Sequence, residues 1–215
     1  VLLDDFDPVR VMEIVEAESI TGGFFVPTMA RALLNVPDFD SYDLSAFESF
    51  GIGAAPSGRQ LKATIEERFG CDLQEAFGQT AMAPTTTLLV PSAVLDKPDS
   101  VGRPVIDVMT KVVDPQTGEE VDQGEIGQVC YKGPTRFQGY YNMAEKTAAV
   151  VDEEGWFHSG DLVRQDEDGY VYFVGRSDDM IVSGGENIYP AEIEGVLHEH
   201  EAVDEAAVVG VPDET

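Results

Sequence analysis

One carboxylate stands in a setting that suits sugar binding. Asp161 closes the run Gly155-Trp156-Phe157-His158-Ser159-Gly160-Asp161, which contains the only tryptophan of the chain. A carboxylate presented from a glycine turn behind an aromatic wall can accept hydrogen bonds from both hydroxyls of a ribose. Further along, Arg176 offers a planar guanidinium that suits ribose or phosphate oxygens. The two side chains predict a nucleotide contact, although each alone also fits a structural turn.

Two earlier runs could hold a planar base. Gly53-Ala54-Ala55-Pro56 consists of small residues and a proline, and such residues at a strand end let a planar group lie flat against the backbone. In Glu75-Ala76-Phe77-Gly78-Gln79-Thr80, the aromatic ring could stack on a base and the hydroxyl could hold a phosphate oxygen. The alternatives are a tight turn for the first run and a buried phenylalanine beside a turn for the second.

A fourth run follows Arg176. It consists of Ser177-Asp178-Asp179-Met180-Ile181 and then Ser183-Gly184-Gly185-Glu186-Asn187-Ile188. Two glycines in succession permit the close approach of a ligand to the backbone. Hydrophobic periodicity predicts that all four runs lie in loops.

Motifs of several other chemistries are missing or incomplete. The sequence contains no G-x-x-x-x-G-K-[ST] phosphate loop and no G-x-S-x-G nucleophile motif. Pro56 stands where a dinucleotide-binding loop needs its third glycine. His198 and His200 are two residues apart and therefore point to different faces of a helix end, and the acidic turn 166–169 lacks the later oxygen ligands of a calcium loop. We therefore predict no metal bound by protein side chains.

Alternating helices and strands must position the first two runs. Asp7 and Pro8 begin a predicted helix that continues to Glu18, and Ser57 is expected to cap another helix, which Gly70 ends. A buried strand is expected over 23–26, a short helix over 27–33 and a strand end over 50–53. This alternation predicts a parallel sheet.

After residue 84 the pattern changes to short β-rich runs separated by turns. Strands are predicted over 108–113, 127–131 and 170–174, and they would form a small antiparallel sheet or barrel. Beyond Gly175 the sequence predicts a hairpin, a helix that begins at Pro190 and a strand over 206–211. The predicted divisions of the chain are therefore 1–84, 85–175 and 176–215.

The composition excludes two classes of partner. The 215 residues include 41 acidic and 13 basic side chains, which gives a net charge of −28. Nucleic acids and anionic membrane surfaces bind clustered lysine and arginine, whereas the basic residues here are scattered singly. Acids spread along the whole chain are typical of a surface adapted to high salt, and the alternative is an ordinary acidic protein. With two cysteines, no signal peptide and no apolar run of membrane-spanning length, we expect a halophile's cytoplasm.

Seven segments, in this order, resemble the adenylate-forming superfamily, which includes acyl-CoA synthetases, luciferases and peptide-synthetase adenylation domains. The segments begin at Gly53, Phe77, Gly124, Gly139, Gly155, Gly175 and Gly184. The resemblance covers the whole chain and implies an α/β fold with three parts. Residues 1–84 would belong to the parallel α/β part of a large N-terminal domain, 85–175 to its β-rich, barrel-like subdomain, and 176–215 to the start of a small α+β C-terminal domain.

The resemblance also implies an activity. Family members use ATP to convert a carboxylic acid to an acyl-adenylate, and most then transfer the acyl group to a thiol such as coenzyme A. The implied nucleotide and coenzyme residues are Gly53, Ala54, Ala55, Pro56, Glu75, Ala76, Phe77, Gly78, Gln79, Thr80, Asp161, Phe173, Arg176 and Gly185.

Individual roles follow from the same resemblance. The residues from Gly53 to Pro56 would line the adenine, Phe77 would stack on it, and Phe173 would pack nearby, with Glu75 or Ala76 at the amino edge. Thr80 would contact the α-phosphate, and Asp161 would hold the ribose with help from Arg176. Asp178 matches the hinge of the small domain, and Gly185 matches a glycine along the pantetheine tunnel. The implied acyl pocket consists of Phe25, Gly53, Gly78 and Ala83.

Three departures from the family pattern matter. The phosphate-binding loop of the family would precede Val1 and its catalytic lysine would follow Thr215, so the chain is expected to be an excerpt of a longer enzyme and to be inactive alone. Ala81 stands where the family has a glutamate that helps to bind the magnesium of MgATP, and alanine offers no oxygen to a hard cation. Natural divergence, an inactivated enzyme and an engineered change are all open explanations of Ala81.

The leading hypothesis is an AMP-forming acid–CoA ligase that uses ATP, Mg²⁺ and coenzyme A. Phe24, Phe25 and nearby small residues suggest a fatty or similarly apolar acid as the substrate. The alternatives are an adenylation domain that loads a carrier protein, a catalytically dead module that still binds nucleotide or acyl-CoA, and an acidic interaction protein. A homodimer remains open.

Overall fold

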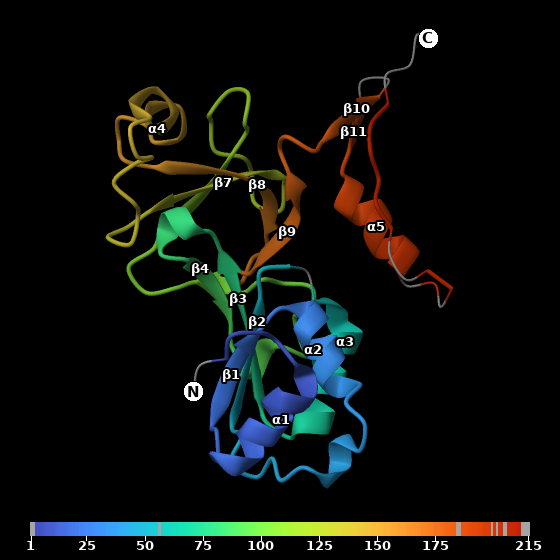
Figure 1. Ribbon diagram of the computed structural model, residues 1–215. Helices are drawn as coiled ribbons and strands as arrows, with labels where there is room; N and C mark the ends of the chain where they lie inside the picture. Colours follow the sequence, from blue (N-terminus) through green and yellow to red (C-terminus); the bar gives the residue numbers. More distant parts are fainter. Residues whose placement is uncertain are drawn as a thin grey trace. The chain divides into compact units, whose positions relative to one another are not determined.

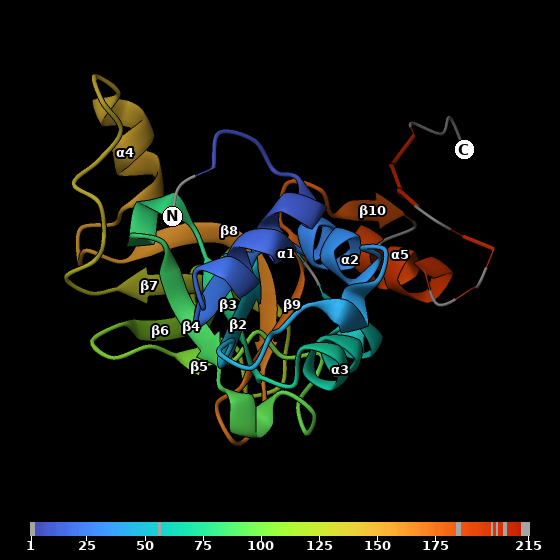
Figure 2. The same cartoon turned by 60° about the horizontal axis from the view of Figure 1, so that its bottom comes forward.

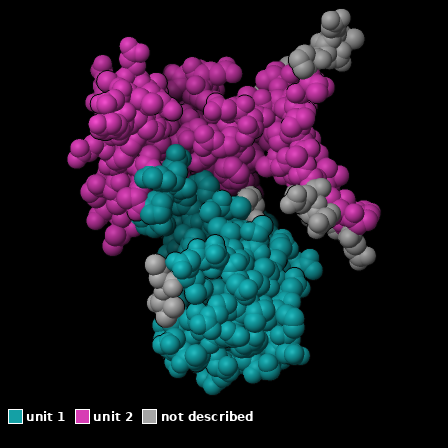
Figure 3. Space-filling view, viewed as in Figure 1, with its two compact units in different colours: residues 1–80, 84–105 teal, residues 81–83, 106–215 magenta. Residues whose placement is uncertain are grey.

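The computed structural model describes residues 3–55, 57–183, 186–198, 200, 202–203 and 206–211. The chain forms two compact units, which Figure 3 shows in different colours. Unit 1 consists of Val1–Thr80 and Pro84–Val105, and unit 2 consists of Ala81–Ala83 and Ile106–Thr215. Pro56 and Gly185, both predicted to bind a ligand, lie outside the described residues.

Unit 1 is built on a five-stranded sheet with its helices gathered on one side (Figure 1). The strands lie in sequence order; the first three are parallel, and the last two continue the sheet in antiparallel pairing. Their bounds are β1 Gly22–Phe25, β2 Ser49–Gly53, β3 Asp72–Gly78, β4 Thr85–Leu89 and β5 Arg103–Pro104. The helices are α1 Pro8–Ala17, α2 Pro27–Leu34 and α3 Gly58–Phe69. The predicted α/β fold with a parallel sheet is confirmed.

Local sequence explains where these helices begin and end. At the start of α1, Asp7 accepts a hydrogen bond of 2.9 Å from the amide of Arg10. Gly70 ends α3 in a left-handed conformation with φ 63°. Ser57 is the N-cap residue of α3, as predicted, but its side chain makes no capping hydrogen bond. Its hydroxyl donates instead to Glu75 Oε1 at 3.0 Å because that buried carboxylate needs a donor.

Aromatic rings fill the space between the sheet and the helices of unit 1. Phe50 of β2 contacts Phe25, Phe47 and Phe69, with ring centroids 5.0, 6.1 and 5.0 Å away. The expectation of a buried strand over 23–26 is wrong for Phe24, which points to the opposite face and is 57% exposed. Successive side chains of a strand point to opposite faces, so Phe25 packs under the helices while Phe24 lies on the other face.

Unit 2 contains an antiparallel sheet of four strands in the order β6-β7-β8-β9 (Figure 2). Their bounds are β6 Met109–Val113, β7 Gly127–Lys132, β8 Phe157–Gln165 and β9 Val171–Arg176. Over the described residues the sheet stays open, so the alternative of a closed barrel is wrong. The predicted hairpin and helix follow as β10 Ile181–Ser183, β11 Glu186–Ile188 and α5 Pro190–His198.

Unit 2 also departs from the sequence predictions. The nine-residue strand β8 runs through a segment that was expected to be a loop. The helix α4 Ala144–Val150 was not predicted, because it has no buried residue and hence no apolar periodicity. The predicted strand over 206–211 is wrong; instead of a ladder bond, the amide of Val208 donates to Glu194 Oε1 at 2.8 Å.

The units divide the chain at a different place from the sequence pattern. β4 and β5 pair with the sheet of unit 1, whose boundary falls at Val105. The division into 1–84, 85–175 and 176–215 concerns a complete enzyme and stays a prediction. No helix in the described part of the chain has both the length and the apolar character needed to cross a membrane.

Candidate functional site

β8 carries a bulge at the predicted ribose-binding residue. Three residues, Ser159–Asp161, lie opposite the single residue Val129 of β7. A bulge bends its strand and redirects the side chains at that point. Asp161 therefore projects from an irregular point of a strand, and its predicted location in a loop is wrong.

Hydrogen bonds hold this bulge in shape. The Ser159 hydroxyl donates to the Val129 carbonyl at 2.6 Å and accepts from the Asp161 amide at 3.0 Å. The Gly160 amide donates to Gln128 Oε1 at 3.0 Å. Gly160 has φ 76°, a conformation that favours glycine. These contacts fix the backbone that leads into the predicted ribose ligand Asp161. Sequence reasoning missed Gln128 as a residue of this site.

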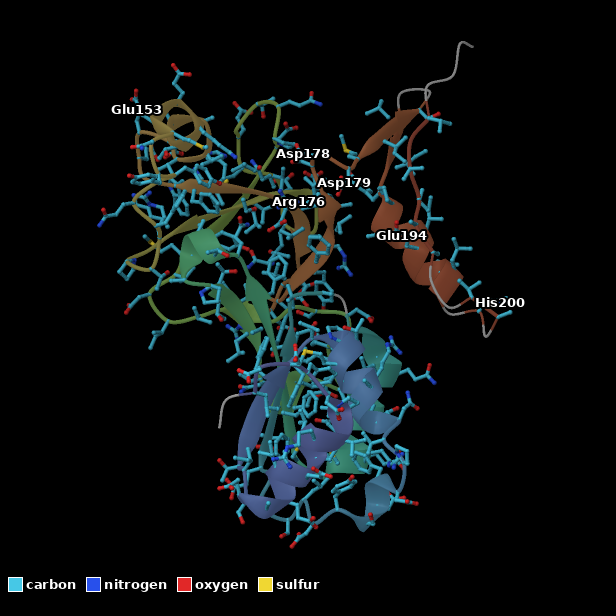
Figure 4. All side chains as sticks on the ribbon, viewed as in Figure 1. Glu153, Arg176, Asp178, Asp179, Glu194 and His200 are labelled. Atoms are coloured by element: carbon cyan, nitrogen blue, oxygen red, sulfur yellow. The ribbon has the colours of Figure 1, made fainter. Side chains whose placement is uncertain are left out.

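Asp161 pairs with Arg176 across β8 and β9. The two residues are register partners, and the guanidinium Nη1 donates to Asp161 Oδ1 at 2.6 Å and to the Ser159 carbonyl at 3.1 Å. The Asp161 side chain is 8% exposed and the Arg176 side chain 42%. The hydrogen bond to Asp161 raises the pKa of Arg176 against the opposing effect of burial, and Asp178 and Asp179 raise it further. Figure 4 labels Arg176 and the two acids that follow it.

The pair combines an acceptor and a donor that suit one polar ligand. A carboxylate accepts hydrogen bonds from hydroxyl groups, while a guanidinium offers several N–H donors in a fixed plane. A ribose carries hydroxyls that both donate and accept. The structure therefore brings Asp161 and Arg176 together in an arrangement that suits the predicted sugar contact.

The sheet of unit 1 sorts the predicted base-binding residues onto its two faces. Successive residues of a strand point to opposite faces, and the register pairs Gly53 with Ala76. Both share the face on which the Phe24 ring lies against Gly53. A Cβ at Gly53 would come within 3.0 Å of the Ala76 carbonyl oxygen, so only glycine fits. Glu75 points to the other face, toward the helices.

Glu75 is already paired inside unit 1. Its carboxylate contacts the ammonium of Lys62 in α3 and accepts a hydrogen bond of 3.0 Å from Ser57. Lys62 also donates to the carbonyl of Pro98. Burial raises the pKa of Glu75, although Lys62 and Ser57 act in the opposite direction. These contacts favour Ala76 over Glu75 as the residue at the adenine edge.

Lys62 is a buried residue that sequence reasoning missed. Its side chain is 2% exposed, and it lies on the same helical face as the buried Ile65 and Phe69. A lysine on the apolar face of an amphipathic helix is unusual unless it is paired. A lysine on the apolar face of a predicted helix is visible in the sequence. This signal could have identified Lys62 as a buried, paired residue.

The predicted stacking and phosphate residues lie where β3 ends. The strand is irregular between Phe77 and Gly78, and the Phe77 carbonyl accepts a hydrogen bond of 3.0 Å from Thr86 of β4. Thr80 begins the 3₁₀ turn Thr80–Met82 and is exposed. An exposed hydroxyl at this point could donate to a phosphate oxygen.

The remaining predicted residues occupy varied settings. Phe25 packs against Phe50 in the core of unit 1. Ala83 has a left-handed backbone with φ 57°. Phe173 is half-buried in β9, and Asp178 is exposed in the turn after that strand. The others are the exposed Ala54 and Ala55 and the half-buried Gln79.

The described side chains do not assemble a metal site. The side chain of Ala81, at the position that the resemblance gives to a magnesium-binding glutamate, has no oxygen to offer. Over the residues that the structure covers, no group of three or more histidine, cysteine, aspartate or glutamate side chains could hold an ion. The described residues therefore do not fit a magnesium ion held by protein side chains alone.

Comparison with known sequences points in one direction. The AMP-binding enzyme family matches residues 1–141. The medium/long-chain-fatty-acid–CoA ligase FadD8 of Mycobacterium tuberculosis is 39% identical over all of this chain and 37% of its own length. A feruloyl-CoA synthase from Amycolatopsis is 40% identical, over 99% of this chain and 43% of that protein. The chain thus spans about two-fifths of the length of these relatives.

Solved structures agree with the sequence match. The amide bond synthetase McbA from Marinactinospora thermotolerans superposes with a TM-score of 0.91 at 34% identity, over all of this chain and 43% of that one. O-succinylbenzoate coenzyme A synthetase (MenE) from Bacillus subtilis, solved in complex with AMP, gives 0.88 at 30% identity, again over all of this chain and 43% of that one. Fold, sequence and the order of the motifs lead to one conclusion: the chain belongs to the AMP-binding enzyme family.

Proposed function

We propose that the protein is an AMP-forming acid–CoA ligase. A carboxylate oxygen of the acid attacks the α-phosphorus of ATP, and pyrophosphate leaves as the acyl-adenylate forms. The thiol of coenzyme A then loses its proton and attacks the acyl carbon, and AMP leaves with the electron pair of the broken C–O bond. The activity is proposed for an enzyme of the relatives' length, of which this chain spans about two-fifths.

The bulge in β8 is the observation that carries this proposal. It presents the nearly buried carboxylate of Asp161 beside the exposed guanidinium of Arg176 at 2.6 Å. In this proposal Asp161 accepts hydrogen bonds from the ribose hydroxyls and Arg176 donates to ribose or phosphate oxygens. The relative MenE was solved in complex with AMP, which supports a nucleotide as the ligand.

Unit 1 is proposed to supply contacts to the base and the acid. Phe77 would stack on the adenine, Ala76 would lie at its amino edge and Thr80 would donate to the α-phosphate. Phe24 is favoured over Phe25 as the ring that contacts the acid, because Phe24 is exposed on the face of Gly53 whereas Phe25 packs in the core.

The acid is proposed to be a fatty or similarly apolar one. The exposed ring of Phe24 offers an apolar surface, and the similar proteins include a fatty-acid–CoA ligase and a feruloyl-CoA synthase. Asp178 is proposed as the hinge for the second half-reaction, since it lies exposed in the turn after β9. The role of Gly185 along the pantetheine and the three-part division of the chain are kept from the sequence predictions.

The test is an acid-dependent ATP–pyrophosphate exchange assay on the protein that carries this chain. Exchange should appear with apolar acids and should be lost in Asp161→Asn. CoA-dependent release of AMP then separates a CoA ligase from a domain that loads a carrier protein. Exchange that needs no acid, or that is unaffected by Asp161→Asn, would contradict the proposal.

A second candidate is a module that binds nucleotide or acyl-CoA without turnover. Ala81 favours it, because the side chain that the resemblance assigns to magnesium has no oxygen. AMP binding without any exchange would support this candidate, and restored exchange in Ala81→Glu would trace the loss to this one position.

We also propose that the protein works in concentrated salt in the cytoplasm. A net charge of −28 repels itself, and at about 1 M KCl the screening length falls to about 3 Å. Cys71 and Cys130 are free thiols, as in a reducing compartment. The melting temperature should therefore rise between dilute buffer and molar KCl, and a flat or falling curve would contradict salt adaptation.

A further inference from the structure

A line of polar contacts leads from the end of α4 to the bulge in β8. Asp152 Oδ2 lies 3.3 Å from His158 Nε2. The other ring nitrogen, His158 Nδ1, lies 3.3 Å from Gln128 Nε2. The side-chain oxygen of Gln128 accepts from the Gly160 amide at 3.0 Å. The residue after Gly160 is Asp161, the proposed ribose ligand.

The donors in this line determine where the histidine proton lies. A backbone amide can only donate, so the oxygen of Gln128 must face Gly160 and its NH₂ group must face His158. His158 Nδ1 is then the acceptor, and the proton of the neutral ring lies on Nε2, where it is donated to Asp152. Each group in the line has one role, and reversing any one of them removes a hydrogen bond.

The surroundings of His158 support the same arrangement. Cys130 Sγ lies 3.4 Å from His158 Nδ1, and burial raises the pKa of Cys130 to about 11, so its S–H is a second, weak donor toward Nδ1. Asp152 is fixed in turn, because its Oδ1 accepts from the Trp156 amide at 2.8 Å.

Charged groups also lie around this face of the sheet. Asp152 is the carboxylate beside the ring, and the ammonium groups of Lys111 and Lys132 lie over the Trp156 ring, 4.7 and 5.6 Å from its centre. Burial acts to raise the pKa of Asp152, but the hydrogen bonds from Trp156 and His158 and the nearby Lys111 lower it. Lys111 also lowers the pKa of Cys130 against the effect of burial.

We propose that His158 is a positioning residue that acts through Gln128 to aim Asp161 at the ribose. The proposal rests on the proposed function of the Asp161 and Arg176 pair. The bulge places three residues opposite Val129, so their amides cannot all follow the regular ladder. Gln128 supplies the acceptor for one of them, and His158 holds the Gln128 amide in the required orientation. Without that acceptor the bulge can relax, and the Asp161 carboxylate loses its fixed direction.

Two substitutions of His158 test the roles of its two ring nitrogens separately. In His158→Asn the side-chain oxygen can take the place of Nδ1 and still accept from Gln128. In His158→Gln the longer amide can take the place of Nε2 and still donate to Asp152, but no acceptor faces Gln128. Gln128→Met removes both contacts at nearly constant volume. The matched control is Gln123→Met in the same unit, which removes a hydrogen bond of 2.9 Å to the Asp166 carbonyl.

The first experiment is NMR on the whole chain, because it does not depend on enzyme activity. Nitrogen shifts of His158 should show a neutral ring with its proton on Nε2. Hydrogen exchange of the Gly160 amide should accelerate by about tenfold in Gln128→Met and in His158→Gln, and should change little in His158→Asn and Gln123→Met. A proton on Nδ1, or unchanged Gly160 exchange in Gln128→Met, would overturn the proposal.

The second experiment measures how much the ribose 2′-hydroxyl contributes to AMP binding. The ratio of the affinities for AMP and 2′-deoxy-AMP should fall by about tenfold in Gln128→Met and His158→Gln and be kept in His158→Asn. A general loss of folding would weaken both ligands equally and leave that ratio unchanged, which would overturn a positioning role. If the unsubstituted protein binds both ligands equally, the ribose role of Asp161 fails and the positioning role falls with it. Gly160 exchange would still report whether the hydrogen-bonded line exists.

Discussion

Among the residues that the structure describes, each unit buries one carboxylate beside one cation, and the two pairs are built differently. In unit 1, Glu75 and Lys62 are 5% and 2% exposed. In unit 2, Asp161 is almost as buried at 8%, but its partner Arg176 is 42% exposed. Sequence reasoning made both carboxylates candidates for nucleotide binding.

The exposure of the cation separates the two pairs. Lys62 is enclosed by Glu75 and the Pro98 carbonyl, and removing either member of a buried pair leaves an uncompensated charge. This pair therefore ties α3 to β3 and stabilises unit 1. The Arg176 side chain stays 42% exposed, so the same kind of pair can meet a ligand. The predictions below are ordered by the expected size of their effects and test this contrast.

Removing the cation of unit 1 should have the largest effect. Lys62→Met leaves Glu75 buried without its partner, and the free energy of unfolding should fall by about 3–5 kcal/mol. Denaturant unfolding followed by circular dichroism measures it. The double variant Lys62→Met with Glu75→Leu should recover most of the loss, because an apolar pair has no charge to desolvate. A loss below about 1 kcal/mol in the single variant would show that the pair is not structural.

Adding a side chain at Gly53 should have the second largest effect on stability. The added Cβ of Gly53→Ala would meet the Ala76 carbonyl, and overpacking of this kind should cost about 2–3 kcal/mol. The control in unit 2 is Gly118→Ala, where φ is 74° and nothing lies within 4 Å; backbone strain alone should cost about 1 kcal/mol. Equal losses in the two variants would mean that β2 and β3 can separate enough to admit a methyl group.

Removing the carboxylate of unit 2 should affect binding more than stability. Asp161→Asn weakens the charge-assisted contact to a hydroxyl, and the dissociation constant of AMP should rise about thirtyfold, or about 2 kcal/mol. Calorimetric titration measures the binding, and Asp122→Asn on the exposed hairpin of the same unit is the control. Unchanged AMP binding, or unfolding as severe as in Lys62→Met, would remove the distinction between the two pairs.

The two thiols should show the smallest effect on stability. Burial raises the pKa of Cys71 and of Cys130 to about 11, so alkylation at pH 8 should be about a hundredfold slower than for an ordinary thiol. Because both values are raised, the stability that the thiols contribute is present below their unfolded pKa of about 8.5 and is lost as the pH rises through 11.

Salt should change the labelling rates of Cys71 and Cys130 differently. Asp72 and Glu66 also raise the pKa of Cys71, whereas Lys111 lowers that of Cys130. Molar KCl screens charge effects, so the labelling rate of Cys71 should increase and that of Cys130 should increase less or fall. Mass spectrometry of alkylated peptides measures each site, and equal responses would contradict the assigned causes.

Elements with strong local signals could be predicted from the sequence. Asp7 and Pro8 mark the start of α1, and Gly70 ends α3, because caps and left-handed glycines act within one turn of a helix. β8 could not be predicted in the same way. Its Ser159–Asp161 segment has the composition of a loop, and only pairing with β7 and β9 makes it a strand.

The residues of the candidate site could also be predicted only in part. The residue types of Asp161, Arg176 and Phe77 were sufficient to suggest sugar, phosphate and base contacts. The sequence could not separate Glu75 from Ala76 or Phe24 from Phe25, because adjacent residues of a strand point to opposite faces and the covered face depends on the helices.

The sequence by itself determined the family, the charge and the order of the chemical groups, since these depend on residue types and local spacing. The tertiary structure decided which groups meet. The buried pair of Lys62 and Glu75 and the line from Asp152 through His158 and Gln128 to Gly160 join residues that are far apart in the chain or on different strands. Such contacts depend on sheet register and on burial, and neither quantity can be obtained from local sequence.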